Sequence, residues 1–255
     1  MRRKLIAGNW KMNKDYKESQ VLAEEIVKNI EPAVLKNTDV LICPAFISLG
    51  IISDIIKDSG IKLGAQNVYS ENDGAFTGEI SAEMLKSVGC EYVITGHSER
   101  RKYMHETNEA VNAKVKQVIN HNLKVIICVG ETQQEREDGI YESIITEQIR
   151  KALENISLEK INDVVIAYEP VWAIGTGLTA TPKEASDIHS LIGKTVSDLY
   201  DTKTAEEILI IYGGSVNKKN AAEMLSACGV DGALIGGASL DPDDFNFIAN
   251  EASKI

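Results

Sequence analysis

Residues 5–30 read LIAGNWKMNKDYKESQVLAEEIVKNI and contain a short apolar run followed by a longer helical pattern. The run at residues 5–11 is brief and mostly apolar, which predicts a β-strand. In residues 16–30 the apolar side chains recur mostly at i and i+4, which predicts a helix with one buried face, and Asp15 can cap its first turn. The opening of the chain therefore predicts one strand followed by one helix.

The same strand-then-helix pattern recurs along the rest of the chain. Strand-like runs are expected at residues 5–11, 39–43, 62–67, 92–95, 124–129, 163–169, 208–212 and 232–235. Pro44, Pro170 and Pro182 lie at the edges of predicted elements and not inside them. Eight strand–helix pairs without a linker between them predict an α/β fold in which one domain, residues 1–255, forms a closed (β/α)8 barrel with eight parallel strands.

Composition and charge exclude several classes of partner. The 255 residues are 44% hydrophobic and 25% charged, as in an ordinary globular protein, and their net charge of −11 disfavours general binding to nucleic acid or to anionic membranes. No apolar run reaches 18 residues, and the N-terminal run is interrupted by Asn9 and Lys11, so we expect neither a membrane span nor an export signal. The four cysteines are widely spaced, which favours a reducing compartment, and we expect a cytoplasmic protein.

Active sites of (β/α)8 barrels lie where the strands end, so residues just after each strand are the first candidates. The first predicted strand ends with Asn9 and Lys11, an amide and a cation. His97 follows the fourth strand, where the start of the next helix disfavours imidazolium and favours a neutral ring that donates a hydrogen bond. A surface role for Lys11 and a structural role for His97 are the alternatives.

The sixth strand runs into Glu169-Pro170, and proline keeps the residue before it extended. Glu169 should therefore stay at the rim of the barrel, where burial would raise its pKa toward the range of a general base. Residues 170–177 combine a stiff apolar start with a pliable end that contains two glycines. This composition favours a hinged lid that excludes water.

Two glycine-rich turns follow the last two strands, Gly213-Gly214-Ser215 and Gly236-Gly237. Consecutive glycines let backbone N–H groups approach an anion, and the loops after strands seven and eight are the usual phosphate site of such barrels. Simple tight turns are the alternative. Because backbone groups would supply most donors, the acidic net charge is no objection to a bound phosphate.

Other chemistry finds little support in the sequence. We find no metal-binding motif, no Rossmann fingerprint and no P-loop, and so expect neither a metal nor a cofactor. Cys128 ends the fifth strand without a partner base in the sequence, so we interpret it as a small packing residue that supports the site and not as a nucleophile.

Taken together, these residues resemble the triosephosphate isomerase family over the whole chain. The blocks that carry the resemblance occur in the family's order: Asn9-Trp10-Lys11-Met12-Asn13, Gly96-His97-Ser98-Glu99-Arg100-Arg101, Ala167-Tyr168-Glu169-Pro170-Val171-Trp172-Ala173-Ile174-Gly175-Thr176-Gly177, Tyr212-Gly213-Gly214-Ser215-Val216 and Ile235-Gly236-Gly237-Ala238-Ser239-Leu240. The resemblance implies interconversion of dihydroxyacetone phosphate and D-glyceraldehyde 3-phosphate, in glycolysis and gluconeogenesis, without cofactor or metal. The family is also a known case of a Glu base paired with a neutral His.

The resemblance also implies a role for each residue of the site. Glu169 would move a proton between the two carbons, and neutral His97 would polarise the carbonyl. Lys11 would stabilise negative charge, and Asn9 would orient the oxygens. The residues implied to hold the substrate are Asn9, Lys11, Gly175, Ser215, Gly236 and Gly237, and Glu99 would be a supporting carboxylate.

Residues 66–79, from Gln66 onward, are long for a connection between a strand and a helix, which suggests a binding role or a merely mobile loop. The resemblance implies that this loop docks into a second subunit, where Thr77 would support the partner's active site in a homodimer. Two alternatives for the whole protein remain: another phosphate-handling barrel, such as an aldolase with Lys11 as its Schiff-base lysine, and a non-catalytic scaffold.

Overall fold

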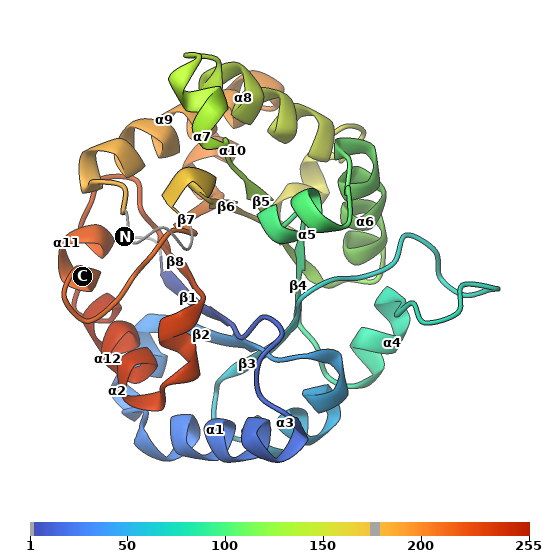
Figure 1. Cartoon of the computed structure of the whole chain (residues 1–255), viewed down its shortest axis with the longest axis vertical. Helices are drawn as coiled ribbons and strands as arrows, with labels where there is room; N and C mark the ends of the chain where they lie inside the picture. The colour runs from blue at the N-terminus through green and yellow to red at the C-terminus, as the bar shows by residue number, and fades with distance from the viewer. Residues whose placement is uncertain (1–2, 174–178) are drawn as a thin grey trace.

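The computed structural model describes residues 3–173 and 179–255, and its eight parallel strands form a closed barrel in the order β1 to β8 (Figure 1). The strands are β1 (Lys4–Asn9), β2 (Thr38–Cys43), β3 (Lys62–Ala65), β4 (Tyr92–Thr95), β5 (Lys124–Val129), β6 (Val164–Tyr168), β7 (Leu209–Tyr212) and β8 (Gly232–Ile235). The predicted fold and all eight predicted strands are confirmed, and no strand end differs from its expected position by more than two residues.

The helices surround the barrel, as Figure 1 shows. They are α1 (Tyr16–Asn29), α2 (Pro32–Asn37), α3 (Leu49–Ile56), α4 (Ala82–Ser87), α5 (Ser98–Tyr103), α6 (Asn108–Asn120), α7 (Gln133–Glu137), α8 (Tyr141–Ala152), α9 (Pro182–Leu199), α10 (Thr202–Glu207), α11 (Ala221–Leu225) and α12 (Pro242–Ala252). Short 3₁₀ turns are present at Phe46–Ser48, Leu158–Asp163, Val171–Ala173 and Gly237–Leu240. Some connections thus hold more than the single helix that the pattern predicted.

The cap predicted for α1 is present. The Asp15 side chain accepts a hydrogen bond from the backbone N–H of Glu18 at 2.9 Å, and the Glu18 side chain accepts one from the N–H of Asp15 at 2.8 Å. This reciprocal capping box satisfies two N–H groups that the first turn leaves without helical partners. The helix ends at Asn29, one residue earlier than predicted, because Ile30 has an extended backbone.

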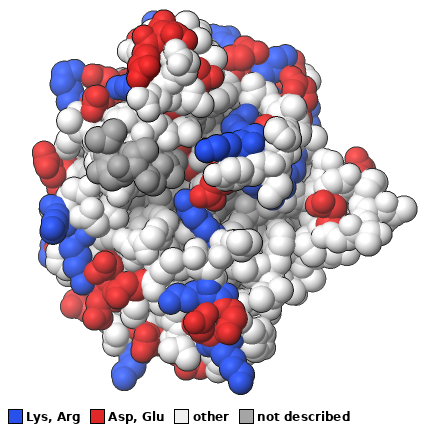
Figure 2. Space-filling model, viewed as in Figure 1, with Lys and Arg blue, Asp and Glu red and all other residues white. Residues whose placement is uncertain are grey.

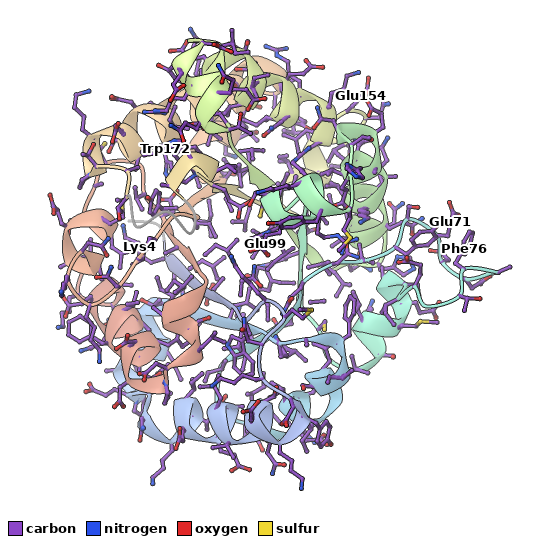
Figure 3. All side chains as sticks on the ribbon, in the orientation of Figure 1. Lys4, Glu71, Phe76, Glu99, Glu154 and Trp172 are labelled. Carbon is purple, nitrogen blue, oxygen red and sulfur yellow. The ribbon has the colours of Figure 1, made fainter. Side chains whose placement is uncertain are left out.

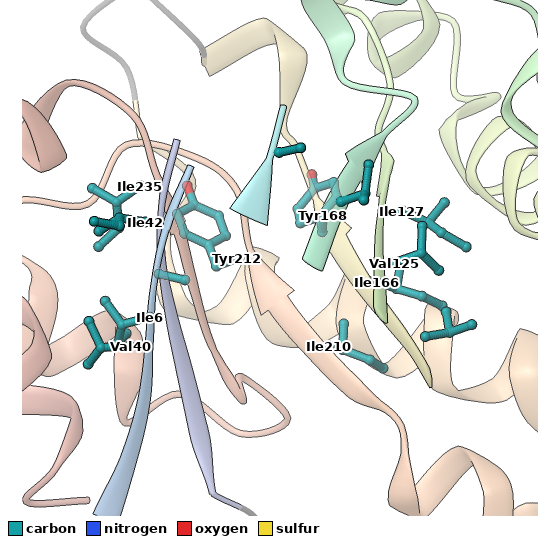
Figure 4. Close-up of a cluster of buried hydrophobic side chains, with 14 of the residues drawn as sticks. Ile6, Val40, Ile42, Val125, Ile127, Ile166, Tyr168, Ile210, Tyr212 and Ile235 are labelled. Carbon is teal, nitrogen blue, oxygen red and sulfur yellow. The ribbon is translucent and has the colours of Figure 1, made fainter. Parts of the chain in front are cut away.

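Strand side chains alternate between two apolar cores. Leu5 and Ala7 belong to the cluster inside the barrel, whereas Ile6, which lies between them, packs in the layer beneath the helices. Figure 4 shows part of that outer layer, with Ile6 and Val40 on neighbouring strands. Both faces of a strand are therefore buried, which explains why the strands are almost continuously apolar.

Closure of the barrel brings β8 against β1. A Cβ atom at Gly232, whose φ is +146°, would lie 1.9 Å from the carbonyl oxygen of Leu5, so the close approach of the two strands requires glycine there. All eight strands run in one direction, and their carboxyl ends meet at one rim of the barrel. The single-domain organisation of residues 1–255 stays a prediction, and the closed sheet agrees with it.

Candidate active site

A cavity of about 690 Å³ opens at the carboxyl ends of the strands. This volume lies within the range of small-molecule sites. Most of the site residues expected from the sequence line it: Asn9, Lys11, His97, Glu99, Glu169, Ser215, Gly236 and Gly237. Figure 2 shows positively and negatively charged side chains next to each other at the centre of this face, and Figure 3 places Glu99 there. The barrel therefore gathers residues from both ends of the chain into one pocket.

Glu169 and His97 form a direct contact in this cavity. Oε1 of Glu169 lies 2.8 Å from Nε2 of His97, and Oε2 accepts a hydrogen bond from the backbone N–H of Ser98 at 2.9 Å. Glu169 follows β6 and is 2% exposed, and His97 follows β4 and is 5% exposed. The two side chains that the sequence put forward for proton transfer are thus buried neighbours.

The hydrogen bonds of His97 define one tautomer of a neutral ring. His97 is the N-terminal cap of α5, and its Nδ1 accepts a hydrogen bond from the backbone N–H of Glu99 at 3.2 Å. An imidazole nitrogen that accepts carries no proton, so the neutral ring carries its proton on Nε2 and donates it to Glu169. Burial lowers the pKa of His97, but the Glu169 and Glu99 carboxylates outweigh burial, and the pKa is raised above 6.5.

The expected rise in the pKa of Glu169 is wrong for this arrangement. Burial does raise it, but His97, the Ser98 N–H and the Lys11 ammonium all favour the carboxylate, and together they lower the pKa below its usual 4.5. Near neutral pH Glu169 is therefore ionised and able to accept a proton. Any group that displaced Glu169 from Nε2 of His97 would remove the main influence that lowers the Glu169 pKa.

Lys11 connects the first strand with this pair. Its Nζ lies 2.7 Å from Oε1 of Glu99, and its backbone N–H donates to Oδ1 of Asn9 at 3.1 Å. Lys11 has a φ of +54°, a left-handed conformation that is uncommon for residues other than glycine. Because Lys11 lines the cavity and is paired with a carboxylate, it lacks the apolar setting of a Schiff-base lysine.

The glycine turns serve two different purposes. Gly236 lies against Lys11, since a Cβ there would be 3.3 Å from Cε of Lys11. At Gly213 a Cβ would lie only 2.9 Å from Cγ of Glu169, so this glycine makes room for the carboxylate. Gly237 and Ser215 line the cavity. Gly175, which was also expected in the site, lies outside the described residues, as do the other lid residues from 174 to 177.

Cys128 is completely buried inside the barrel. Burial raises the pKa of its thiol, and the negative charge of Glu169 raises it further, so the side chain stays a neutral thiol. This environment agrees with the predicted packing role and not with a nucleophile.

Glu131, a carboxylate with no exposed surface, was not among the site residues expected from the sequence. Its Oε1 accepts hydrogen bonds from the Tyr168 hydroxyl at 3.1 Å and from Nε1 of Trp172 at 2.9 Å, and it pairs with Arg136 at 2.8 Å. The guanidinium of Arg136 also lies over the Trp172 ring, 4.9 Å from its centroid. Glu131 therefore ties the start of the predicted lid to β6 and α7. Its place two residues beyond the end of β5 was the available signal, because His97 lies equally far beyond β4 and Glu169 directly follows β6.

The long loop at residues 66–79 projects from the barrel between β3 and α4, with Phe76 near its tip (Figures 1 and 3). Its base is anchored: Gln66 donates to the carbonyl of Lys11 at 2.8 Å, and Asn67 accepts from Nζ of Lys114 at 2.8 Å. Burial lowers the pKa of Lys114 to about 8. Thr77 is exposed and is not among the described residues that line the cavity of its own chain.

No group of three His, Cys, Asp or Glu side chains in residues 3–173 and 179–255 is arranged to hold a metal ion. Within the same ranges no helix is long and apolar enough to cross a membrane.

The chain is similar in sequence to known proteins along nearly its whole length. A model of the family described as triosephosphate isomerase matches residues 4–252. The chain is 50% identical over 245 residues to triosephosphate isomerase of Dictyoglomus thermophilum, and this match covers 96% of this chain and 98% of that protein. It is 48% identical over 252 residues to triosephosphate isomerase of Chlorobium phaeobacteroides, and this match covers 99% of this chain and 100% of that protein. It is 47% identical over 250 residues to triosephosphate isomerase of Clostridium tetani, and this match covers 98% of this chain and 97% of that protein.

Proposed function

Because this chain belongs to the triosephosphate isomerase family and interconverts dihydroxyacetone phosphate and D-glyceraldehyde 3-phosphate in glycolysis, we propose that Glu169 is its catalytic base and His97 its electrophile. The observation that carries this assignment is the 2.8 Å contact between Oε1 of Glu169 and Nε2 of His97 in a cavity that Lys11 also lines. A base and a hydrogen-bond donor within reach of each other are what proton transfer beside a carbonyl requires.

The proposed reaction moves one proton between neighbouring carbons. Glu169 removes the proton from the carbon beside the carbonyl, and the electron pair left behind forms an enediolate. His97 donates from Nε2 to the carbonyl oxygen and relays protons between the two oxygens, and Glu169 returns its proton to the other carbon. Because substrate must take the place of Glu169 at Nε2, binding separates the pair that is joined in this structure.

Negative charge on the substrate is stabilised by the groups around this pair. We assign Lys11 to the developing enediolate and Asn9 to orientation of its oxygens, since Asn9 ends β1, Lys11 lies two residues beyond it, and both line the cavity. Ser215, Gly236 and Gly237 hold the phosphate from the loops after β7 and β8. Gly175 is also assigned to the phosphate, from the sequence alone. Glu99 keeps Lys11 directed into the pocket through the 2.7 Å contact.

The lid assignment concerns residues 170–177. Its support is that Trp172, at the start of this segment, is held by Glu131 and Arg136 next to the cavity. A lid would exclude water and keep the enediolate from losing its phosphate. Shortening the segment of residues 172–176 should leave the fold intact and let the enediolate escape, which then loses phosphate as methylglyoxal. Unchanged product purity in that variant would contradict the lid role.

We further propose that the protein is a homodimer joined through residues 66–79. The support is that this loop projects from the barrel and that the partly exposed Phe76 ring packs on Tyr69, with 4.8 Å between the ring centroids. Thr77 would then reach the partner's site. A cytoplasmic location is also proposed, because Cys43, Cys90, Cys128 and Cys228 are all free thiols, as is usual in reducing compartments.

The first experiment compares three proteins in a coupled isomerase assay with a chelator present. Glu169→Gln removes the base with little change in size, and we expect kcat to fall by about 100- to 10,000-fold or more. Glu154→Gln changes an exposed glutamate in the same way and should retain wild-type kcat. Near-normal turnover of Glu169→Gln would refute the assignment of the base, and loss of wild-type activity in chelator would show that a metal is needed.

A further inference from the structure

Arg101 lies behind the turn that presents His97, and none of the roles above uses it. From the fourth residue of α5 its side chain reaches back past the start of the helix. Its Nε donates to the carbonyl oxygen of Gly96 at 3.0 Å, and its Nη1 donates to Oδ1 of Asn108 at 2.7 Å. The guanidinium therefore bonds directly to the peptide group that joins Gly96 to His97.

The turn at Gly96 leaves little freedom for this peptide. Gly96 has a φ of +68°. A Cβ at Gly96 would lie 3.1 Å from Cγ2 of Val111 and 3.2 Å from both Nη2 of Arg101 and the carbonyl oxygen of Cys128. The chain therefore turns from β4 into α5 between tightly packed neighbours. Arg101 closes one side of this space, because its planar donors match two acceptors at once.

The charge of Arg101 also bears on the site. Burial lowers the pKa of its guanidinium and the Glu169 carboxylate raises it, while the group itself stays cationic. Its Nη2 is buried and has no hydrogen-bond partner among the described residues. The buried guanidinium is therefore held in place by its two hydrogen bonds and by attraction to the Glu169 carboxylate.

We propose that Arg101 is a positioning residue for the isomerase reaction: it fixes the Gly96 carbonyl so that Nε2–H of His97 points into the cavity when substrate displaces Glu169. This proposal rests on the assignment of His97 as the electrophile. Arg101 itself touches no reacting atom, so its removal should change the rate of the chemical step much more than substrate binding.

The test compares Arg101→Met, Arg101→Lys and Asn108→Ala, with Arg150→Met, an exposed arginine on α8, as the matched control. Arg101→Met should lower kcat by about 100-fold and change KM by less than about threefold, since a small misplacement near the chemistry has an effect of this size. Arg101→Lys retains the charge without the double hydrogen bond and should recover part of the loss. Arg150→Met should match the wild type.

A spectroscopic readout separates positioning from general stability. In ¹⁵N NMR spectra His97 should show one neutral tautomer in the wild type with dihydroxyacetone phosphate bound, and a mixture of tautomers in Arg101→Met. A kcat within twofold of the wild type, or an unchanged His97 spectrum, would overturn the proposal. If Arg101→Met does not fold, Asn108→Ala decides, because it frees one end of the guanidinium and should lower kcat by about three- to tenfold.

The same series distinguishes this inference from the function on which it rests. His97→Gln should be nearly inactive if His97 is the electrophile. Loss of activity in His97→Gln together with a fully active Arg101→Met would overturn only the role of Arg101. Full activity of His97→Gln would overturn the assignment of His97.

Discussion

Nε2 of His97 and Oε1 of Glu169 are 2.8 Å apart, although the two residues end different strands of the barrel. Each changes the proton affinity of the other: the carboxylate raises the pKa of His97, and the imidazole lowers that of Glu169. The two residues therefore titrate as a coupled pair, and changing one of them should alter the behaviour of the other.

Glu169→Gln should lower the pKa of His97. In the wild type burial lowers this pKa while Glu169 raises it above 6.5, so loss of the carboxylate leaves burial as the largest influence. An NMR titration of the histidine rings should show His97 titrating below 6.5 in the variant. His189, whose pKa burial lowers to about 4, provides an internal control that should not move. An unchanged titration of His97 would contradict the coupling.

The stability difference between the wild type and Glu169→Gln should depend on pH in a defined window. The lowered pKa of Glu169 stabilises the fold above pH 4.5, and this contribution is lost as the pH falls through the folded-state pKa. The raised pKa of His97 stabilises below pH 6.5 and is lost as the pH rises through its folded-state value. The free energy of unfolding of the two proteins can be measured with urea at constant protein concentration. The difference between them should be largest in the range from pH 4.5 to pH 6.5. A difference that does not vary with pH would show that the pair is not coupled.

Gly213→Ala should impair catalysis by displacing the base. The added Cβ would lie 2.9 Å from Cγ of Glu169 and 3.0 Å from the carbonyl oxygen of Tyr168. We expect kcat to fall by about 10- to 100-fold, measured in the coupled assay. Gly50→Ala is the matched control because a Cβ there meets no atom within 4 Å. It should keep full activity and stabilise α3 by about 0.5–1 kcal/mol. Wild-type kcat in Gly213→Ala would mean that Glu169 can adjust without loss.

Glu131→Ala should destabilise the fold strongly. The change would leave the Tyr168 hydroxyl, Nε1 of Trp172 and the Arg136 guanidinium without their shared acceptor. Breaking such a buried charge network costs about 3–5 kcal/mol, whereas Glu154→Ala breaks an exposed pair at 3.9 Å and should cost about 1 kcal/mol or less. Chemical denaturation of both variants measures the two losses, and equal losses would argue against the anchoring role of Glu131.

Phe76→Asp should convert the proposed dimer into monomers. Phe76 is 39% exposed near the tip of the projecting loop, and a carboxylate there would have to be desolvated in a subunit interface. Phe247→Asp tests a phenylalanine of similar exposure, 38%, on α12 and should leave the assembly unchanged. Sedimentation at micromolar protein concentration distinguishes the two cases. A wild type that sediments as a monomer would refute the dimer itself.

Several parts of the site were accessible from the sequence because they depend on local pattern. Glu169 and His97 could be selected because each lies within two residues of the end of a short apolar run, and strand ends are where such barrels carry their chemistry. The cap at Asp15 follows from the residues of one helical turn. Glu131 follows the same rule and escaped selection because nothing in its neighbouring sequence distinguished this buried residue from exposed carboxylates.

By itself, the sequence determined the eight strands, the parallel barrel and the rim on which the functional side chains lie, since apolar runs and helical periodicity are properties of neighbouring residues. Tertiary structure alone decided that Glu169 pairs with His97 and that its pKa is lowered and not raised. The physical reason is that burial and charge act in opposite directions on a carboxylate, and their balance depends on distances between residues that only closure of the barrel brings together.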